Sequence, residues 1–362
     1  MRRPARVLFA ALFLLAGAAW GEPRVVNVYN WADYIGPTTL EDFTAETGIR
    51  VNYDTYDSSE IVEAKLLAGS TGYDVVVHGA QYASRLIPLG LFLELDRERL
   101  PHWRGLDPHV LRMLADYDPG NRHSAPYTWG STGFAYNVRL VRERIPDAPV
   151  DSGDMIFDPE VAARLADCGI SFLDSPTDVL PMALVYLGLD PNTIDPEQLA
   201  AAGQLLSSVR PYIKYFSSTR MLIDLPNEEV CVAMSWSGDY ARARAHAREA
   251  GLDIDLAYTV PKEGSVDWID GFFIPSDAPH RDEAYEFIDF LLRPEVIAAV
   301  TNETRYANAV RASRPFVDPV ILADPAVYAT PSVIARLRST LSLPPKVERL
   351  RTRAFARFKA GM

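Results

Sequence analysis

Acidic and aromatic residues recur together in this chain in a pattern that suits cation binding. Three of its six tryptophans are followed within three residues by an aspartate, giving the pairs Trp31 and Asp33, Trp236 and Asp239, and Trp268 and Asp270. The face of an indole ring attracts a cation through its quadrupole, and a carboxylate adds a charge-assisted hydrogen bond. The three pairs therefore predict a closed pocket for an organic cation that carries amino groups.

Each of these residues also has an ordinary structural interpretation. Asp239 could cap the helix that it begins, and so could Asp178, while Asp33 could lie in a plain turn. Each of the three tryptophans could be a core aromatic, which is the usual role of a tryptophan. The repeated pairing with acids, and the positions of the pairs in the expected fold, favour binding over these alternatives.

The elements that must position these residues alternate between strands and helices. In the first part of the chain, apolar runs and helix-capping signals predict strands at 24–29, 51–56 and 73–78, with helices at 37–46, 59–68 and 80–89. In the second part they predict strands at 134–138, 169–173, 231–236, 257–260 and 272–275, and helices after Asp178 and at 239–250, 282–292 and 345–362. The repeated strand–helix order predicts an α/β fold with parallel, doubly wound sheets.

The candidate residues lie where such a fold places a ligand. In doubly wound sheets, ligands bind beyond the carboxyl ends of the strands. Segments 31–34, 79–82 and 236–239 each lie between a predicted strand and the next helix, and 174–178 follows another strand end. Asp270 is expected in a turn before Phe272. We therefore expect five segments that are distant in sequence to converge on one crevice.

The N-terminal residues are typical of a secretory signal peptide. Three arginines precede an apolar run from Val7 to Ala19, which is too short to span a membrane, and small residues follow at the cleavage offsets. We predict that residues 1–21 are removed. No cysteine follows the cut after Gly21, so a lipid anchor is not expected. The mature protein is predicted to be exported to a bacterial periplasm.

Length and charge narrow the class of protein further. Loss of the three arginines at the N-terminus changes the formal net charge from -12 to -15. An acidic surface attracts cations and argues against nucleic acid as a partner, although it also serves solubility. About 340 residues at roughly 150 per domain predict two domains or one long α/β unit.

No motif in the sequence supports an enzyme. The nucleophile elbow, the zinc-protease helix, the phosphate-binding loop and the dinucleotide-binding glycine pattern are all missing, and the six histidines show no metal-ligand spacing. We expect no metal and no cofactor. The two cysteines, Cys168 and Cys231, are favoured to be bridged in an oxidising compartment, with two buried thiols as the alternative.

Seven short motifs place the chain near a known family. They are YNWADYI at 29–35, KLLAGSTGYD at 65–74, SFLD at 171–174, WSGD at 236–239, PKEG at 261–264, LLRP at 291–294 and YANA at 306–309. With these motifs the chain resembles the polyamine-binding proteins of bacterial ABC transporters, and most closely those that bind putrescine. The resemblance covers essentially the whole mature chain, in order.

The resemblance implies a type II periplasmic binding fold, in which two doubly wound α/β lobes are joined by two crossing strands and close over a ligand. Lobe 1 would comprise residues 22–132 and 258–308, and lobe 2 residues 133–257 and 309–362. It also implies that Cys168 and Cys231 are bridged within the second lobe. A closing receptor of this kind works as a monomer and delivers its ligand to an inner-membrane permease with its ATPase.

The same resemblance implies roles for single residues. Asp239 and Asp270 would hold ammonium groups, and Asp33 and Asp178 would contribute directly or through water. The aromatic walls would be Trp31, Tyr34, Trp236, Trp268 and Tyr306. Gln81 stands where the putrescine-binding relatives carry a serine, and Asp178 where they carry a glutamate. These departures leave the preferred polyamine length open.

The expected function is capture of a polyamine, with putrescine favoured, for an ABC importer. The alternatives are a receptor that prefers spermidine or another organic cation, and a polyamine sensor that signals rather than transports. An exported enzyme acting on amines is a third possibility, but it would need a catalytic group that the sequence does not offer.

Overall fold

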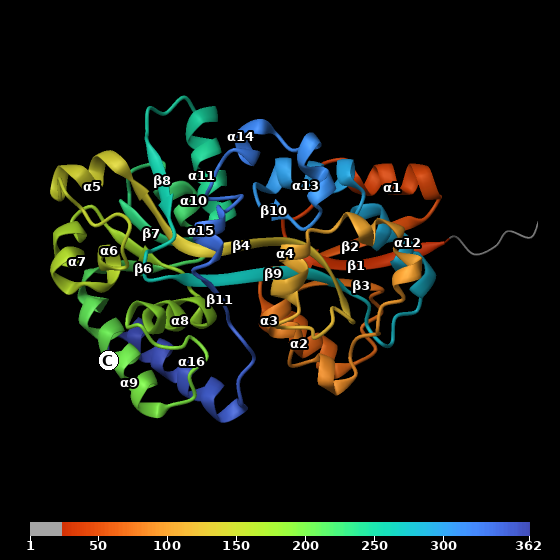
Figure 1. The fold of residues 1–362 in the computed structure, drawn as a ribbon, viewed down its shortest axis with the longest axis horizontal. Helices are drawn as coiled ribbons and strands as arrows, with labels where there is room; N and C mark the ends of the chain where they lie inside the picture. The colour runs from red at the N-terminus through yellow and green to blue at the C-terminus, as the bar shows by residue number, and fades with distance from the viewer. Residues whose placement is uncertain (1–23) are drawn as a thin grey trace, which may run out of the picture.

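The computed structural model describes residues 24–362 as two α/β halves that share two long strands (Figure 1). The predicted signal peptide at 1–21 lies outside the described residues. The strands are β1 (Val25–Trp31), β2 (Arg50–Tyr56), β3 (Val75–Gly79), β4 (Ser124–Asn137), β5 (Ile170–Phe172), β6 (Ile213–Phe216), β7 (Val232–Trp236), β8 (Leu256–Thr259), β9 (Ser265–Phe273), β10 (Ala307–Asn308) and β11 (Leu337–Ser339).

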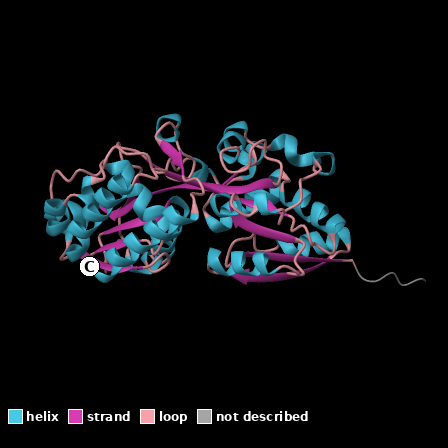
Figure 2. Cartoon of the chain, turned by 90° about the horizontal axis from the view of Figure 1, so that it is seen from below, coloured by secondary structure: helices cyan, strands magenta, loops and turns pink. Residues whose placement is uncertain are grey.

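Helices cover both faces of the strands in each half (Figure 2). They are α1 (Thr39–Thr47), α2 (Ser59–Ala68), α3 (Ala80–Ala83), α4 (Pro108–Leu114), α5 (Val138–Arg144), α6 (Asp154–Phe157), α7 (Pro159–Leu165), α8 (Pro176–Tyr186), α9 (Pro196–Val209), α10 (Met221–Asp224), α11 (Ser237–Glu249), α12 (Arg281–Leu291), α13 (Pro294–Thr304), α14 (Pro319–Leu322), α15 (Pro331–Ile334) and α16 (Pro345–Ala360). Short 3-10 helices are η1 (Ile87–Leu89), η2 (Arg97–Arg99), η3 (Pro101–Gly105), η4 (Arg210–Tyr212) and η5 (Arg311–Phe316).

The strands follow the order β2-β1-β3-β9-β4-β7-β5-β6. In the first half β1 is parallel to both β2 and β3, and in the second half β5 is parallel to both β6 and β7. These parallel groups are the doubly wound units predicted from the sequence. The long strands β4 and β9 are antiparallel to their neighbours in this order and were predicted only in part.

The strand β4 passes from one half to the other. Its residues 124–131 pair with β9, and from Thr132 onward it pairs with β7, so that Thr132 lies opposite Trp236. The strand β9 is its antiparallel partner in the crossing region (Figure 1). A third segment also lies here, because β11 pairs in parallel with residues 265–267 of β9.

Two large hydrophobic cores lie on either side of this crossing region. The first contains residues of β1, β3, β9, α12 and α13, and also Val310, Val317, Ile321 and Val327. The second contains residues of β5, β7, α8 and α9 together with Val347 and Phe358. Burial of each core stabilises one lobe by the hydrophobic effect. The exact lobe boundaries given above remain a prediction.

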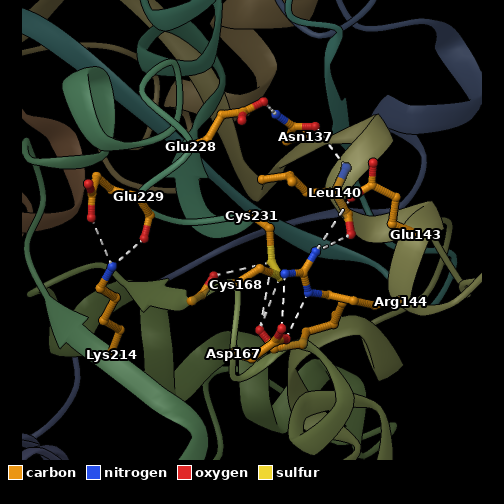
Figure 3. The surroundings of a disulfide bond; sticks show 12 residues. Asn137, Leu140, Glu143, Arg144, Asp167, Cys168, Lys214, Glu228, Glu229 and Cys231 are labelled. Carbon is orange, nitrogen blue, oxygen red and sulfur yellow. Dashed lines mark hydrogen bonds and ion pairs between the residues drawn. A yellow bond between two sulfur atoms is a disulfide. The ribbon is translucent and has the colours of Figure 1, made fainter.

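The disulfide implied by the family resemblance is present between Cys168 and Cys231, with 5.5 Å between their Cα atoms. It joins the chain ahead of β5 to the start of β7, two parallel neighbours in the second lobe. The bidentate ion pair of Arg144 with Asp167, at 2.7 and 2.9 Å, lies beside it. Figure 3 also shows Lys214, whose ammonium contacts one carboxylate oxygen of Glu229 at 3.2 Å and the backbone carbonyl of the same residue.

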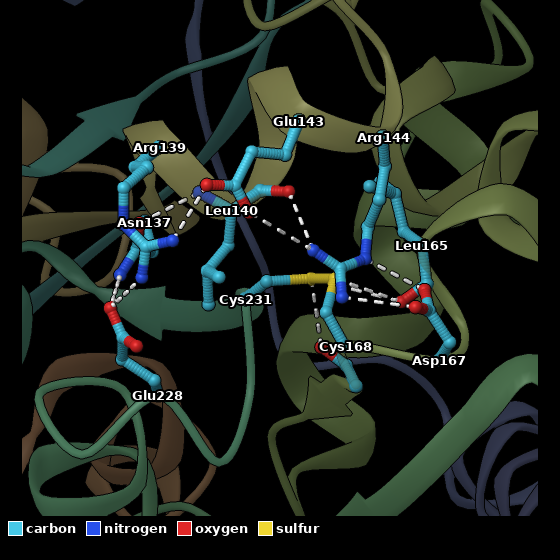
Figure 4. A network of polar contacts seen from close by, with 11 residues as sticks. Asn137, Arg139, Leu140, Glu143, Arg144, Leu165, Asp167, Cys168, Glu228 and Cys231 are labelled. Atoms are coloured by element: carbon cyan, nitrogen blue, oxygen red, sulfur yellow. Dashed lines mark hydrogen bonds and ion pairs between the residues drawn. A yellow bond between two sulfur atoms is a disulfide. The ribbon is translucent and has the colours of Figure 1, made fainter.

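A second group of polar contacts continues from this bridge along α5. The side chain of Asn137 accepts a hydrogen bond from the Leu140 backbone N–H at 3.0 Å and so caps the start of the helix. Arg139 pairs with Glu228, the residue three positions before Cys231 (Figure 4). These contacts and the disulfide fix the amino end of β7, at the opposite end of that strand from Trp236.

Candidate functional site

Three strand ends carry the candidate residues, as predicted. Trp31 is the last residue of β1, Gly79 ends β3 and Trp236 ends β7, and a turn or helix follows each of them. The expectation that Asp270 lies in a turn is wrong, because both Trp268 and Asp270 belong to β9. In this strand Asp270 pairs with Gly79 of β3. The sheet therefore brings Asp270 beside the end of β3.

Asp270 forms the first acidic position of the cleft. The hydroxyl of Tyr34 donates a hydrogen bond to its carboxylate at 2.8 Å, and the same hydroxyl lies 2.5 Å from Oγ1 of Thr128 on β4. Burial raises the pKa of Asp270 to about 6, against the lowering effect of the Tyr34 hydrogen bond. Tyr34 thus occupies Oδ2, the Trp31 indole lies near enough to lower the pKa as well, and Oδ1 accepts no hydrogen bond within the described residues.

Gln81 lies over Gly79 next to this carboxylate. A Cβ atom on Gly79 would lie 3.0 Å from Oε1 of Gln81, so the amide covers the glycine closely. Paired residues on antiparallel strands point to the same face of the sheet, which puts this amide on the side of Asp270. The Oε1 atom of Gln81 is buried and has no hydrogen-bond partner within the described residues. It is an acceptor that a ligand N–H could use.

Asp239 forms the second acidic position, in the first turn of α11. The hydroxyl of Tyr306 donates a hydrogen bond to Oδ1 of Asp239 at 2.6 Å. Burial raises the pKa of Asp239 to about 6. The tyrosine can approach this closely because residue 238 is glycine, at which a Cβ atom would lie 2.1 Å from the Tyr306 ring.

The aromatic residues connect the two carboxylates. The rings of Tyr34 and Tyr306 pack edge to face with 5.6 Å between centroids, and Trp268 packs against Tyr306 at 5.1 Å. Trp31 packs against Tyr56 at 4.4 Å. The ring of Trp268 occupies space above Gly130, where a Cβ atom would lie 2.3 Å from it. Asp239 and Asp270 are thus joined through one continuous aromatic surface.

Asp178 is a third carboxylate of the region, buried next to Trp236. It accepts hydrogen bonds from the hydroxyls of Thr132 and Ser175, each at 2.5 Å, and from the indole N–H of Trp236 at 3.2 Å. Burial raises its pKa, and these three donors act in the other direction. Trp236 itself packs partly against both hydrophobic cores, so it lies between the lobes.

Among the hydrogen bonds between the lobes, two lie beside the candidate residues. One is the bond between Tyr306 of the first core and Asp239 on α11. The other links the Tyr82 hydroxyl on α3 to Oγ1 of Thr177 on α8 at 2.8 Å. The lobes are therefore in contact around the candidate site, with the aromatic walls and carboxylates between them.

Asp33 lies apart from these buried acids. Its side chain is exposed, and its backbone has a φ of 54°, in the left-handed region that aspartate tolerates better than most residues. The structure therefore brings nine of the ten predicted ligand residues into the region where the two lobes meet and leaves Asp33 exposed in the turn after β1. This position agrees with the alternative given for Asp33 in the sequence analysis, that of an ordinary turn residue.

Sequence reasoning missed the two threonines that contact the cleft carboxylates. Thr128 and Thr132 lie in the first part of β4, where Pro126 and two glycines are more typical of a loop than of a central strand. No local signal marks these threonines, because pairing with β9 imposes the strand conformation there. His78 is buried, and burial lowers its pKa to about 3, so it is a neutral side chain and not a base.

No group of three or more potential metal ligands occurs among residues 24–362. Over the same residues, no helix combines the length and the apolar character needed to cross a bilayer. The site instead contains two carboxylates, Asp239 and Asp270, that each accept one tyrosine hydroxyl and are surrounded by aromatic rings. Such an arrangement suits cations that carry N–H donors, because each carboxylate still has an oxygen to offer.

Comparison with known proteins places the chain in a family. Residues 38–329 match the model for bacterial extracellular solute-binding proteins. The chain is 43% identical over its full length to the putrescine-binding periplasmic protein SpuD of Pseudomonas aeruginosa, all of which is covered. It is 42% identical to the putrescine-binding periplasmic protein PotF of Escherichia coli, over 97% of this chain and 96% of that protein.

Solved structures show the same fold. The spermidine/putrescine transporter substrate-binding protein PotD of Streptococcus pneumoniae superimposes with a TM-score of 0.80 at 28% identity, over 93% of this chain and 99% of that one. A spermidine/putrescine transporter protein of Listeria monocytogenes gives a TM-score of 0.82 at 29% identity over the same shares. The predicted two-lobe binding fold is confirmed, and the chain belongs to the family of bacterial extracellular solute-binding proteins.

Proposed function

We propose that this protein captures a polyamine, with putrescine favoured, and delivers it to an ABC importer. The observation that carries the proposal is the pair of carboxylates of the buried Asp239 and the half-buried Asp270, each of which accepts one tyrosine hydroxyl and would keep an oxygen for a ligand. A diamine has two ammonium groups, and burying each of them is costly unless it is paired. Two carboxylates joined by an aromatic surface meet this requirement.

The aromatic walls would hold the methylene groups between the two ammonium heads. Each cation–π contact contributes roughly 0.5–2 kcal/mol, and each charged hydrogen bond about 1.5–3 kcal/mol. After the cost of association, two anchors and two or three aromatic contacts are compatible with about 8 kcal/mol, which corresponds to micromolar binding. A ligand that touches both lobes favours the closed state through this difference in affinity.

The relatives support a transport role. SpuD and PotF are named as periplasmic binding proteins, and the two solved structures are named as parts of ABC transporters. We propose that the protein works as a monomer with a membrane permease and its ATPase. We also propose that cleavage after residue 21 releases it into the periplasm without a lipid anchor, and that it is not an enzyme.

Agmatine is a second candidate ligand. A Pseudomonas aeruginosa relative named as a putrescine/agmatine-binding protein is 46% identical over 96% of this chain and 95% of that protein. Agmatine replaces one ammonium with a guanidinium, which presents more N–H donors in a planar fork. The unpartnered Oε1 of Gln81 beside Asp270 offers an acceptor for one of these extra donors.

Isothermal titration calorimetry of the mature protein tests the proposal. The protein is first unfolded and refolded to remove any amine bound during expression, and it is then titrated with putrescine, agmatine, cadaverine and spermidine. Tight one-to-one binding of putrescine is expected. Absence of heat from all four amines would exclude a polyamine receptor, and putrescine uptake that persists in cells without the protein would favour sensing over transport.

A further inference from the structure

Asp178 differs from the carboxylates of Asp239 and Asp270 in the number of hydrogen bonds that it accepts from the protein. It lies in the first turn of α8 with about 8% of its surface exposed. Its Oδ1 atom accepts from the hydroxyl of Thr132 and the indole N–H of Trp236, and its Oδ2 atom accepts from the hydroxyl of Ser175. Asp239 and Asp270 each accept a single tyrosine hydroxyl.

The protein donors fill most of the hydrogen-bond acceptor sites of the Asp178 carboxylate. A carboxylate has about four lone-pair sites, and here three of them are filled by neutral donors of the protein, two on one oxygen. Two of the three bonds measure 2.5 Å, which is short for a hydroxyl-to-carboxylate bond. An ammonium group would have to displace one of these donors or share the single remaining site.

The same bonds fix the wall of the cleft. Thr132 is the residue at which β4 leaves β9 and begins to pair with β7, and it lies opposite Trp236 in that pairing. The bond to Asp178 gives the Trp236 indole N–H a partner, whereas the indole N–H groups of Trp31 and Trp268 are buried without one within the described residues. Of the three tryptophans, Trp236 is the one whose indole N–H donates to a carboxylate within the described residues, while the Trp31 indole lies close enough to Asp270 to lower the pKa of that carboxyl without forming such a bond.

We propose that Asp178 is a positioning residue, which holds the Trp236 indole and the start of α8 against β4 and does not pair with a ligand ammonium group. The inference rests on the proposed function and makes it more specific. The cleft then offers two carboxylates, Asp239 and Asp270, which match a ligand with two positive charges. A triamine would bury a third ammonium without a carboxylate to pair with it, so the site selects diamines over spermidine.

Substitution of Asp178 by asparagine and by alanine separates positioning from pairing. Asparagine keeps an acceptor for Thr132 and Trp236, and its amide N–H can donate to Ser175, whose hydroxyl can turn to Thr177 at 3.0 Å. Asp178→Asn is therefore expected to bind putrescine within about 5-fold of the original protein. Asp178→Ala leaves three donors without a partner and is expected to weaken binding by roughly 30-fold or more.

The decisive readout is whether Asp178→Asn keeps the putrescine affinity that Asp178→Ala loses. If Asp178 pairs directly with an ammonium group, both variants lose its charge and both weaken binding by about 30-fold or more, as expected for Asp270→Asn. Near-ultraviolet circular dichroism provides a second readout, since the signal of the ordered indole is expected to persist in Asp178→Asn and to fall in Asp178→Ala.

Asp178→Glu covers the case in which the asparagine variant does not fold. It keeps the negative charge but moves the carboxylate outward by one methylene, away from its three donors. Positioning predicts weaker putrescine binding by this variant, whereas direct pairing predicts binding that is retained or tighter. Failure of the original protein to bind any amine would instead refute the proposed function, so the two failures are distinguishable.

Discussion

Replacement of Asp270 by asparagine is expected to change ligand affinity and folding stability in opposite directions. Burial raises the pKa of Asp270 from 3.8 to about 6. At 1.36 kcal/mol per pKa unit, keeping this carboxylate ionised at neutral pH costs the ligand-free protein up to about 3 kcal/mol. Asparagine removes that cost and retains an acceptor for the Tyr34 hydroxyl, so the ligand-free variant is expected to be more stable.

The same change removes one partner of a buried charge pair in the complex. Such truncations cost about 2–5 kcal/mol, which corresponds to a roughly 30- to 5000-fold increase in Kd for putrescine. The assays are calorimetric titration of the refolded variant at pH 7.5 and denaturant unfolding without ligand. Both use the same preparation, so loss of binding can be separated from loss of fold.

Asp267→Asn is the matched control, three residues earlier on the same strand. Asp267 is buried, and burial raises its pKa to about 6 as it does for the half-buried Asp270, but its carboxylate accepts from Tyr117 at 2.9 Å and from Ser339 at 3.3 Å, outside the cleft. The control is expected to keep its affinity within a few-fold. Wild-type affinity in Asp270→Asn, or equal losses in both variants, would refute the assignment of Asp270 as an anchor.

Three further predictions concern pH, the disulfide and the close contacts of glycine. Burial raises the pKa of both cleft carboxylates to about 6, so acidification from pH 7.5 to 5 protonates them and should lower putrescine affinity by about tenfold per carboxylate. Because these pKa values exceed those of the unfolded chain, the same acidification should raise the melting temperature of the ligand-free protein. A putrescine affinity that does not change with pH in calorimetry would contradict this. Replacing both cysteines by serine should cost about 4 kcal/mol in urea unfolding, from the 63-residue separation, with Kd unchanged. Gly238→Ala places a methyl group against Tyr306 and should weaken binding at least tenfold, whereas Gly203→Ala on α9, with no atom within 4 Å, should leave it unchanged; equal Kd values would show that the glycine contact does not control closure.

Local sequence signals predicted the parallel units well. The helix expected at 59–68 has those bounds, and the expected stop of α1 at Gly48 is present, with a φ of 71°. Residues at the ends of β1, β3 and β7 could be assigned to one crevice because parallel strands all present their carboxyl ends at the same edge. These features depend on patterns within about ten residues.

The two crossing strands were harder to predict for a physical reason. Residues 124–133 and 265–271 are rich in glycine, serine, threonine and aspartate, which local propensity assigns to turns. Their strand conformation is imposed by pairing with each other across more than 130 residues of chain. Because Thr128, Thr132 and Asp270 lie in these strands, their contacts in the site could not be derived from local patterns.

The place of β9 in the sheet has a consequence for how the chain folds. It lies between β3 and β4, although both of these precede it by well over 100 residues. A chain that ends before residue 265 would leave facing edges of β3 and β4 unpaired, and unpaired edges promote association with other chains. The first lobe therefore cannot finish its sheet until the second lobe has been synthesised, so we expect N-terminal fragments of this protein to aggregate and the complete chain to fold slowly, as a single unit.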